Sequence, residues 1–320
     1  MSPSVPDGRS TVGVVIPTLN GARFLRPGLD ALRRQTRRPD TVVVVDDGST
    51  DETGELLARE YPEVEVVVHT RPLGVARGFN DGIRATSTSL VALLNNDTEA
   101  EPDWLERLCQ PLDGEPDVSC AASKLLLFDR RTVLQSAGDF FGRDGMPGNR
   151  GVWQTDCGQY DRQLEPFGAC AAAAAYRRSA LDELGLFDET FGSYVEDVDL
   201  CFRARLAGQH CRFVPDARVY HHLSATGGGT TSSYYVGRNV LWLLAQDMPA
   251  VLLRRYLPRI VARQLDIAAE AIRHGREPAA RARLCGQVAG LRTLGQRLPR
   301  RREIQRTRRI SIAELDALLT

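Results

Sequence analysis

Three short polar segments follow runs of aliphatic residues in the first hundred positions of the chain. They are Ile16–Gly21, Asp46–Asp51 and Asn95–Asp97. Ligands of an open parallel sheet bind where its strands end, so we expect the three segments to meet along one edge. Carboxylate and amide groups gathered there can pair with the polar atoms of a nucleotide, and a carboxylate can hold a hard cation beside the phosphates.

Two carboxylates in these segments have specific chemical uses. Asp46 comes directly after four valines, where it can accept a hydrogen bond from a base or a ribose. In the structural alternative, this segment only caps the next helix through Thr50 or Asp51. Asp97 can bind Mg²⁺ or Mn²⁺, which prefer oxygen ligands and keep substrate phosphates among them. Its structural alternative is a polar turn before the helix that begins near Trp104.

A denser acidic cluster lies a hundred residues further on, where Glu196, Asp197 and Asp199 alternate with apolar side chains. Favourable interaction with a helix N-terminus explains one or two carboxylates, but not a cluster packed among aromatic and aliphatic residues. Crowding of like charges raises the pKa of a carboxyl group, which suits a general base. His221 and His222 follow this cluster, and a histidine on its own is more often a packed side chain than a ligand.

The elements that must position these residues alternate between strands and helices through the first half of the chain. Runs of β-branched and aliphatic residues predict strands at 11–16, 41–45, 64–69 and 90–94. Helical spacing of apolar residues predicts helices at 22–34, 52–61 and 74–85. This alternation predicts an α/β fold whose central sheet is mostly parallel, with helices on both faces.

The second half of the chain is less regular. Residues 129–167 carry many glycines, aspartates and arginines, and we expect loops and short strands that cover a site. The other elements predicted here are a buried strand at 169–176, a helix at 197–206, an edge strand at 211–214 and a helix at 232–246.

The last seventy residues predict helices alone. An apolar stripe that includes Leu253, Ile260 and Ile272 lies opposite arginines, and Pro258 should kink this helix or mark its start. A second helix is expected at 278–294. The whole chain has a formal net charge of zero, but residues 251–310 alone carry 16 arginines against four acidic residues.

Such a basic amphipathic extension suits an anionic partner, and we expect that partner to be an anionic membrane surface. The alternative is that the stripe packs on the rest of the chain or on the second subunit of a homodimer. Nucleic acid is not expected, because no aromatic interleaving and no nucleic-acid motif accompany the arginines. Seven cysteines without C-x-x-C spacing, and the lack of a secretory signal, predict a cytoplasmic protein with reduced thiols.

In combination these motifs resemble the inverting family 2 glycosyltransferases of the GT-A fold, and most of all their rhamnosyltransferase-like bacterial branch. The resemblance covers residues 12–250. It divides the chain into a disordered start at 1–10, a GT-A catalytic domain at 11–250 and a basic amphipathic helical extension at 251–320. The segments that carry it are Val14–Gly21, Val43–Thr53, Leu73–Ile83, Leu93–Asp97, Leu184–Glu189, Glu196–Cys201 with Arg203, Pro215–His221, and Arg238 with Asn239.

The resemblance implies that the first half of the chain binds the nucleotide of a sugar donor. Asp46 would hydrogen-bond the uracil or thymine ring, and Asn96 would approach the ribose or the sugar. The other residues that would line the nucleotide pocket or shape its wall are Pro17, Thr18, Asn20, Gly74 and Asn80.

The resemblance also implies the metal ligands and the catalytic residues. Asp97 takes the metal position of the family's D-x-D motif, although Asn95 stands where many members carry an aspartate. His221 matches an occasional second ligand of the family, and the cofactor would be Mn²⁺ or Mg²⁺. Asp197 would be the general base that removes the proton of the acceptor hydroxyl, with Glu196 beside it for the acceptor.

The implied reaction moves a sugar from a UDP- or dTDP-linked donor to an acceptor hydroxyl with inversion. The acceptor would be a glycan or a lipid-linked glycan in cell-surface polysaccharide or glycolipid assembly, on the inner face of the cell membrane. An inactive module of the same fold that binds nucleotide or glycan is the alternative, and Asn95 is its support. A pyrophosphorylase or a dinucleotide enzyme would need a glycine-rich loop after the first strand, and none is present there.

Overall fold

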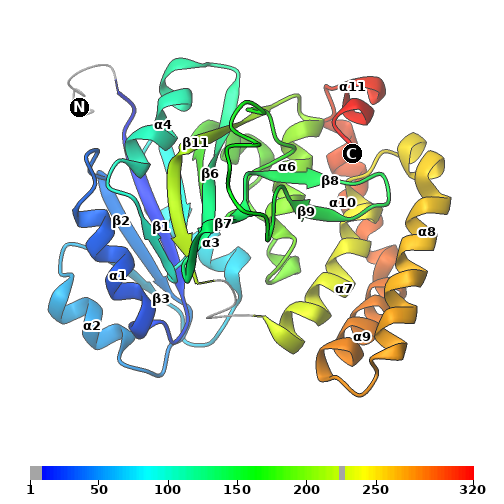
Figure 1. Cartoon of the computed structure of the whole chain (residues 1–320), viewed down its shortest axis with the longest axis horizontal. Helices are drawn as coiled ribbons and strands as arrows, with labels where there is room; N and C mark the ends of the chain where they lie inside the picture. The colour runs from blue at the N-terminus through cyan, green and yellow to red at the C-terminus, as the bar shows by residue number, and fades with distance from the viewer. Residues whose placement is uncertain (1–8, 223–227) are drawn as a thin grey trace.

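The computed structural model describes residues 9–222 and 228–320. Most of the predicted disordered start, residues 1–8, therefore lies outside the described residues. A central sheet with helices on both faces occupies one side of the molecule, and a group of helices from the C-terminal part of the chain occupies the other (Figure 1).

The first half of the chain forms the parallel βα unit that the sequence predicts. Strands β1, β2 and β4 lie side by side, with β3 outside β2, and each neighbouring pair is parallel. The strands are β1 (Val12–Thr18), β2 (Thr41–Asp46), β3 (Glu65–Val68) and β4 (Leu90–Leu94), and the helices are α1 (Ala22–Arg33), α2 (Thr53–Glu60) and α3 (Val75–Ala85).

The second half adds antiparallel strands, so the complete sheet is mixed. Its order is β3-β2-β1-β4-β10-β6-β11-β5, and β7 pairs with β6. The strands are β5 (Thr98–Ala100), β6 (Val118–Leu127), β7 (Arg130–Ser136), β10 (Ala173–Arg177) and β11 (His210–His221), and β8 (Asp139–Phe141) and β9 (Pro147–Asn149) form a separate hairpin. The helices are α4 (Trp104–Gly114), α5 (Arg178–Leu184) and α6 (Glu196–Leu206), with the short 3-10 helix η2 (Glu189–Phe191).

Two strands differ from the sequence-based expectation. The predicted edge strand at 211–214 pairs with β6 alone, but its predicted extent is wrong, because β11 continues to His221 and residues 219–221 also pair with β5. The predicted strand ends before Pro215. In the structure the strand continues past this proline, and its pairing with β6 shifts register between Val214 and Arg218. Strand β6 was not predicted, since Lys124, the single lysine of the chain, suggests a surface. Lys124 is 1% exposed and pairs with two aspartates.

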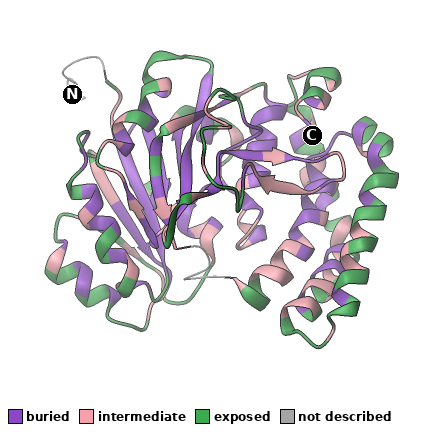
Figure 2. Ribbon diagram, viewed as in Figure 1, coloured by how far each residue is buried: buried purple, intermediate pink, exposed green. Residues whose placement is uncertain are grey.

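Both faces of the parallel strands are buried, which explains why they are continuous aliphatic runs. Val14 packs with α1, α2 and α4 on one face, and Val15 packs with α3, α5 and α6 on the other. Figure 2 shows this as a buried sheet between helices whose outer sides are exposed. The helices packed on both faces hold the strands in place, and the polar segments begin where these strands end.

The C-terminal helices pack against one side of the part of the chain that contains the sheet. Residues Leu252, Tyr256 and Ile260 of α8 share an apolar cluster with Phe141 of β8 and Phe202 of α6. This part of the predicted stripe therefore packs on the rest of the chain, while other members of it stay exposed. The helices are α7 (Gly229–Gln246), α8 (Ala250–Arg273), α9 (Pro278–Thr293), α10 (Leu298–Arg306) and α11 (Ile312–Ala317), with the 3-10 helix η3 (Leu294–Arg297).

Pro258 lies inside α8, so it does not mark the start of that helix. Among the described residues, no helix combines the length and the hydropathy that crossing a membrane requires.

Candidate active site

The three predicted polar segments meet at one edge of the sheet. Thr18 and Asp46 are paired in the parallel register of β1 and β2. Asn96, which follows β4, donates from Nδ2 to the Thr18 hydroxyl over 2.8 Å. The backbone N–H of Asp47 donates to the carbonyl of Thr18 over 2.8 Å. The edge is therefore continuous across three strands, as the parallel order predicts.

The turn after β2 is held by its own polar groups. Asp46 Oδ1 accepts the backbone N–H of Ser49 over 2.8 Å. Asn20 adopts a left-handed φ of 51°, and its side-chain oxygen accepts the N–H of Thr50 over 2.7 Å. Asp51, rather than Thr50, bonds to the start of α2 through Thr53. The capping alternative is thus satisfied by Asp51, and Asp46 lies buried at the strand end.

The wall beside this turn is built from Asp47, Gly74 and Asn80. The two oxygens of Asp47 accept the N–H groups of Leu73 and Gly74 over 2.8 and 2.9 Å. Gly74 has φ of 97°, and a Cβ there would lie 2.8 Å from the carbonyl oxygen of Gly192. Only glycine suits this close approach in a left-handed conformation.

The buried amide of Asn80 is used inside the protein. Its Nδ2 donates to Phe187 O and to Glu189 Oε1 over 2.9 and 2.8 Å, and its Oδ1 accepts the N–H of Phe187 over 2.9 Å. With both amide hydrogens engaged, Asn80 shapes the wall by fixing the segment before η2.

Asp97 and His221 face each other although 124 positions separate them in sequence. His221 Nε2 lies 2.9 Å from Asp97 Oδ1, and both side chains are buried. His221 Nδ1 lies 2.7 Å from Gln135 Oε1 on β7. Because an amide oxygen only accepts, this contact places a proton on Nδ1 and turns Nε2 toward Asp97.

The donor chemistry of this pair fits a divalent cation. A carboxylate oxygen from the segment after β4 and an imidazole nitrogen from β11 converge, and the contact with Gln135 orients the imidazole. Within the described residues no group of three or more histidine, cysteine, aspartate or glutamate side chains could hold a metal ion. Among the described residues, Asp97 and His221 would be the ligands from the protein, and other oxygen atoms would complete the coordination.

Asp197 lies in the first turn of α6, on a different element from Asp97 and His221. Its two oxygens accept the N–H groups of Ala171 and Val198 over 3.2 and 2.9 Å. Burial raises the pKa of Asp197, and these backbone N–H groups act in the opposite direction. The N–H of Asn95 donates to the carbonyl of Ala172, so residues 171–172 connect the two carboxylates.

Two further carboxyl groups surround Asp197. Burial, followed by the charge of Asp197, raises the pKa of Glu196 well above its usual range. Glu196 Oε2 is buried and has no hydrogen-bond partner among the described residues. On β8, burial and then the charge of Asp197 raise the pKa of Asp139 to about 8. Like charges this close cannot all ionise, so the cluster favours protonated neighbours around one base.

Comparison with known proteins gives the family. The model of glycosyl transferase family 2 matches residues 13–185, which is more than half of the chain. The chain belongs to glycosyltransferase family 2. The pre-mycofactocin glycosyltransferase of Mycobacterium tuberculosis is 32% identical over 225 residues, covering 68% of this chain and 44% of that protein.

Other relatives differ in length. The N-acetylglucosaminyl-diphospho-decaprenol L-rhamnosyltransferase of M. tuberculosis is 28% identical over 258 residues, covering 69% of this glycosyltransferase and 79% of that protein. An uncharacterized protein of Sinorhizobium fredii is 28% identical, and the match spans 25% of its length. This glycosyltransferase thus spans less than half the length of some curated relatives that it matches.

Solved structures share the fold. GalNAc-T7 with UDP, GalNAc and Mn²⁺ superposes with a TM-score of 0.59 at 19% identity, covering 73% of this chain and 48% of that one. The mannosyltransferase PcManGT of Pyrobaculum calidifontis, with GDP-Man and Mn²⁺, gives a TM-score of 0.54 at 18% identity and covers 95% and 88%. The predicted GT-A fold and family are confirmed.

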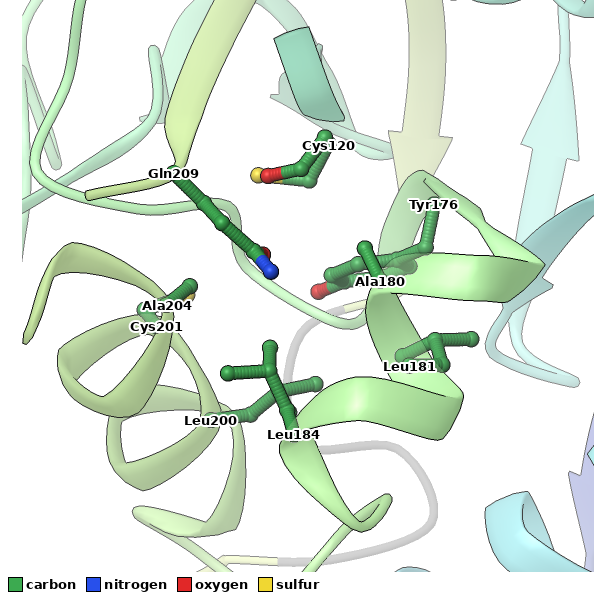
Figure 3. A pocket seen from close by; sticks show the side chains of 10 residues that line it. Cys120, Tyr176, Ala180, Leu181, Leu184, Leu200, Cys201, Ala204 and Gln209 are labelled. Carbon is green, nitrogen blue, oxygen red and sulfur yellow. The ribbon is translucent and has the colours of Figure 1, made fainter. Parts of the chain in front are cut away.

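A small cavity of about 10 Å³ lies apart from these residues in the glycosyltransferase (Figure 3). Among its lining residues are Tyr176 and Gln209, whose buried Oη and Oε1 atoms have no hydrogen-bond partner among the described residues. This volume suits one water molecule between two polar atoms. It contains none of the predicted site residues and is too small for a nucleotide.

Three residues near the site escaped the sequence analysis of this glycosyltransferase. Asp47 was named within a motif but given no role, although it fixes the turn before α3. Gln135 and Asp139 lie in the region expected to form loops and short strands, where no periodic signal marks them. Each meets its partner only after the chain folds, so the local pattern held no sign of either contact.

Proposed function

We propose that this glycosyltransferase moves a sugar from a UDP- or dTDP-linked donor to an acceptor hydroxyl with inversion of the anomeric carbon. The observation that carries the proposal is the arrangement of two separate carboxylates. Asp97 is paired with His221 at the strand ends, and Asp197 is held by backbone N–H groups at the start of α6. One carboxylate can therefore serve the donor while the other stays free to take a proton.

The proposed reaction is one in-line displacement. Asp197 accepts the proton of the acceptor hydroxyl, and the hydroxyl oxygen forms a bond to the anomeric carbon. The bond from that carbon to the phosphate oxygen breaks, and its electron pair leaves with the nucleoside diphosphate. Glu196, whose raised pKa favours the protonated form, would orient the acceptor beside the base.

Asp97 and His221 are the residues that would hold Mn²⁺ or Mg²⁺. The bound cation would neutralise charge on the departing diphosphate. The imidazole favours Mn²⁺, because Mg²⁺ prefers an all-oxygen shell. Support for this choice comes from two structural neighbours that were solved with Mn²⁺.

The nucleotide would bind along the strand-end edge. Asp46, buried at the end of β2 beside Thr18, would accept a hydrogen bond from the base, and Pro17, Thr18 and Asn20 would line the pocket. Asn96 bonds to the Thr18 hydroxyl in the present structure and would approach the ribose or the sugar. Gly74 and Asn80 fix the wall of the pocket through their contacts with the segment around η2.

We propose a glycan or lipid-linked glycan as the acceptor, in cell-surface polysaccharide or glycolipid assembly at the cytoplasmic face of the membrane. The rhamnosyltransferase relative, whose name includes a diphospho-decaprenol compound, supports this choice. An exposed apolar surface on α8 and α9 adds support. Leu265 and Ile272 of α8 are 64% and 68% exposed, and Val288 and Leu291 of α9 are exposed beside them.

This surface suits an anionic lipid layer. Gln287 of α9 bonds to Gln264 of α8, so the two helices present their exposed apolar residues on adjoining faces. The helices carry many exposed arginines, which would be attracted to anionic headgroups and would repel the same surface of a second copy.

Vesicle sedimentation tests the membrane proposal. Full-length protein should sediment with phosphatidylglycerol-containing vesicles and stay in solution with phosphatidylcholine alone. The double change Leu265→Glu and Ile272→Glu should abolish this binding, while Val68→Glu, at an equally exposed valine on β3, should not. Equal binding by the double variant would contradict the proposal.

A donor screen tests the reaction itself. Common UDP-, dTDP- and GDP-sugars are offered with Mn²⁺ and a panel of glycan acceptors, and release of the free nucleotide diphosphate is measured. One UDP- or dTDP-sugar should be consumed. Binding of nucleotide without turnover of any donor would instead favour the inactive binding module.

A further inference from the structure

The segment directly before Glu196 and Asp197 adopts an unusual backbone conformation. Gly192, Tyr194 and Val195 have φ angles of 73°, 66° and 73°. A left-handed φ is common for glycine, but for a β-branched residue it is a genuine outlier. Val195 is also the residue from which α6 begins, so its strained conformation sets the direction of that helix.

One buried side chain from another element holds this segment. Asn239 of α7 is fully buried, and the two hydrogens of its Nδ2 are shared among three backbone carbonyls within hydrogen-bond distance. The acceptors are Phe191, Ser193 and Tyr194, at 3.1, 3.0 and 2.7 Å. The shortest of these three distances is the one from Asn239 Nδ2 to the carbonyl oxygen of Tyr194, in the peptide between Tyr194 and Val195.

The orientation of the Asn239 amide is determined by its neighbour. Arg238 Nε donates to Asn239 Oδ1 over 2.8 Å, and an arginine can only donate. The nitrogen of the amide must then point at the three carbonyls. Arg238 also donates from a terminal nitrogen to the carbonyl of Phe191 over 2.8 Å, so both residues of the pair act on the same segment.

The held segment touches both halves of the site. On one side, Gly192 accepts the N–H of Ala76 over 3.0 Å and lies against Gly74 at the start of α3. On the other side, Val195 accepts the N–H of Asp199 over 3.0 Å and so opens the helix that carries Asp197. A change in this segment would therefore move the base relative to the donor wall.

We infer that Asn239 is a positioning residue that keeps the strained Tyr194–Val195 turn in place, and that this turn sets the position of Asp197 relative to the donor. The sequence analysis marked Asn239 only as part of a resemblance, without a role. The inference rests on the proposed function of Asp197 as the base. Strained backbone persists only where its surroundings over-determine it, and Asn239 supplies that constraint.

The main test compares turnover with donor binding in purified full-length protein. Asn239→Ala should lower kcat by about 10²-fold, the scale of a small misplacement of a catalytic group. The dissociation constant of the donor nucleotide should change less than about threefold, because Asn239 bonds to Phe191, Ser193 and Tyr194, and the bond of Gly192 to Ala76 does not involve it. Gln287→Ala, which removes a buried amide from the α8–α9 pair, serves as the matched control and should leave kcat unchanged.

A second change tests whether strain is the cause. Glycine adopts a left-handed φ at little cost, so in Val195→Gly the turn should keep its conformation without the hydrogen bonds from Asn239. Val195→Gly alone should have a kcat within about threefold of the wild-type value. The double variant with Asn239→Ala should have a kcat at least about tenfold higher than that of Asn239→Ala alone. If Asn239→Ala does not fold by itself, the double variant should fold. A double variant that fails to fold, or that shows no recovery, would contradict the inference.

Hydrogen exchange separates this inference from the proposed function. Amides 193–199 should exchange faster in Asn239→Ala than in wild type, and at wild-type rates in Gln287→Ala, whatever the enzyme transfers. A wild-type protein that turns over no donor while this exchange pattern holds would overturn only the proposed function. Unchanged exchange in Asn239→Ala, or a kcat within about threefold of wild type, would overturn the inference.

Discussion

The strand-end edge and the start of α6 hold their side chains in different ways. At the edge, Asp46 accepts a bond from a residue three positions away, and Asn20 from one thirty positions away within the same parallel unit. At α6, the strained turn before Asp197 depends on Asn239, 45 positions further along the chain. The strand-end edge is thus built from neighbouring parallel strands and the turns that follow them, and the start of α6 from a strained turn that a later helix holds.

This difference implies that binding and turnover can be separated by mutation. Changes at the edge should weaken nucleotide binding, and turnover should fall with it. Changes around α6 should lower turnover while nucleotide binding persists. Asp97 and His221 belong to neither group alone, because their contact joins the strand-end edge to the distant strand β11.

The largest expected effect lies at the edge. Asp97→Ala should reduce transfer to the level seen without metal and weaken binding of the nucleotide diphosphate, because it removes a carboxylate ligand. EDTA should inactivate the wild type, and added Mn²⁺ should restore it. Asp103→Ala, at an exposed aspartate nearby, is the control. Full activity of Asp97→Ala at ordinary Mn²⁺ or Mg²⁺ would contradict the metal assignment.

The next effect belongs to the base. Asp197→Asn should lower kcat at least ~10²-fold, the usual scale for a removed general base, with an unchanged dissociation constant for the donor. Calorimetric titration with nucleotide and steady-state kinetics provide the two measurements. Asp182→Asn, at an exposed position on α5, should change neither quantity. Lost donor affinity with unchanged kcat would make Asp197 a binding residue.

A smaller effect should come from Gln135, which acts through His221. Gln135→Leu removes the acceptor that directs Nε2 toward Asp97, and second-shell changes of this kind cost about 10–100-fold in metal affinity. Titration of Mn²⁺ followed by electron paramagnetic resonance measures it. Gln163→Leu is the matched control on the neighbouring exposed loop. Equal Mn²⁺ affinity in Gln135→Leu would remove Gln135 from the site.

The smallest effect concerns stability near the base. Asp139 has a pKa of about 8 in the folded chain and about 3.9 when unfolded, so both states keep the proton below pH 4. As pH rises toward 8, the unfolded chain loses this proton first, and the stability linked to it is progressively lost. Asp139→Asn should therefore show a smaller fall in Tm between pH 5 and pH 8, by on the order of 5 °C. Parallel Tm curves for the two proteins would contradict the assignment.

The sequence predicted the donor half well, because its signals are local. Aliphatic runs mark the parallel strands, and each polar segment follows one directly, so Thr18, Asp46 and Asn96 could be placed together before the structure was known. The acidic cluster at α6 was also visible in the sequence. Its position relative to the donor was not, since that depends on how distant elements pack.

The missed features share a physical cause. Strand β6 carries Lys124, which looks like a surface residue until Asp156 and Asp161 are seen to neutralise it. Gln135 meets His221 across 86 positions, and Asn239 meets Tyr194 across 45. Periodicity and capping rules describe neighbours along the chain, so they do not predict such contacts.

The configuration of the first transfer product tests the central claim most directly. The account has one free carboxylate acting as a base and no covalent intermediate, so a single displacement must invert the anomeric centre. With the donor found in the screen, the anomeric proton of the product is followed by NMR from the start of the reaction. An anomeric configuration opposite to that of the donor is the predicted result. A product that retains the donor's configuration would contradict the assignment of Asp197 as the base.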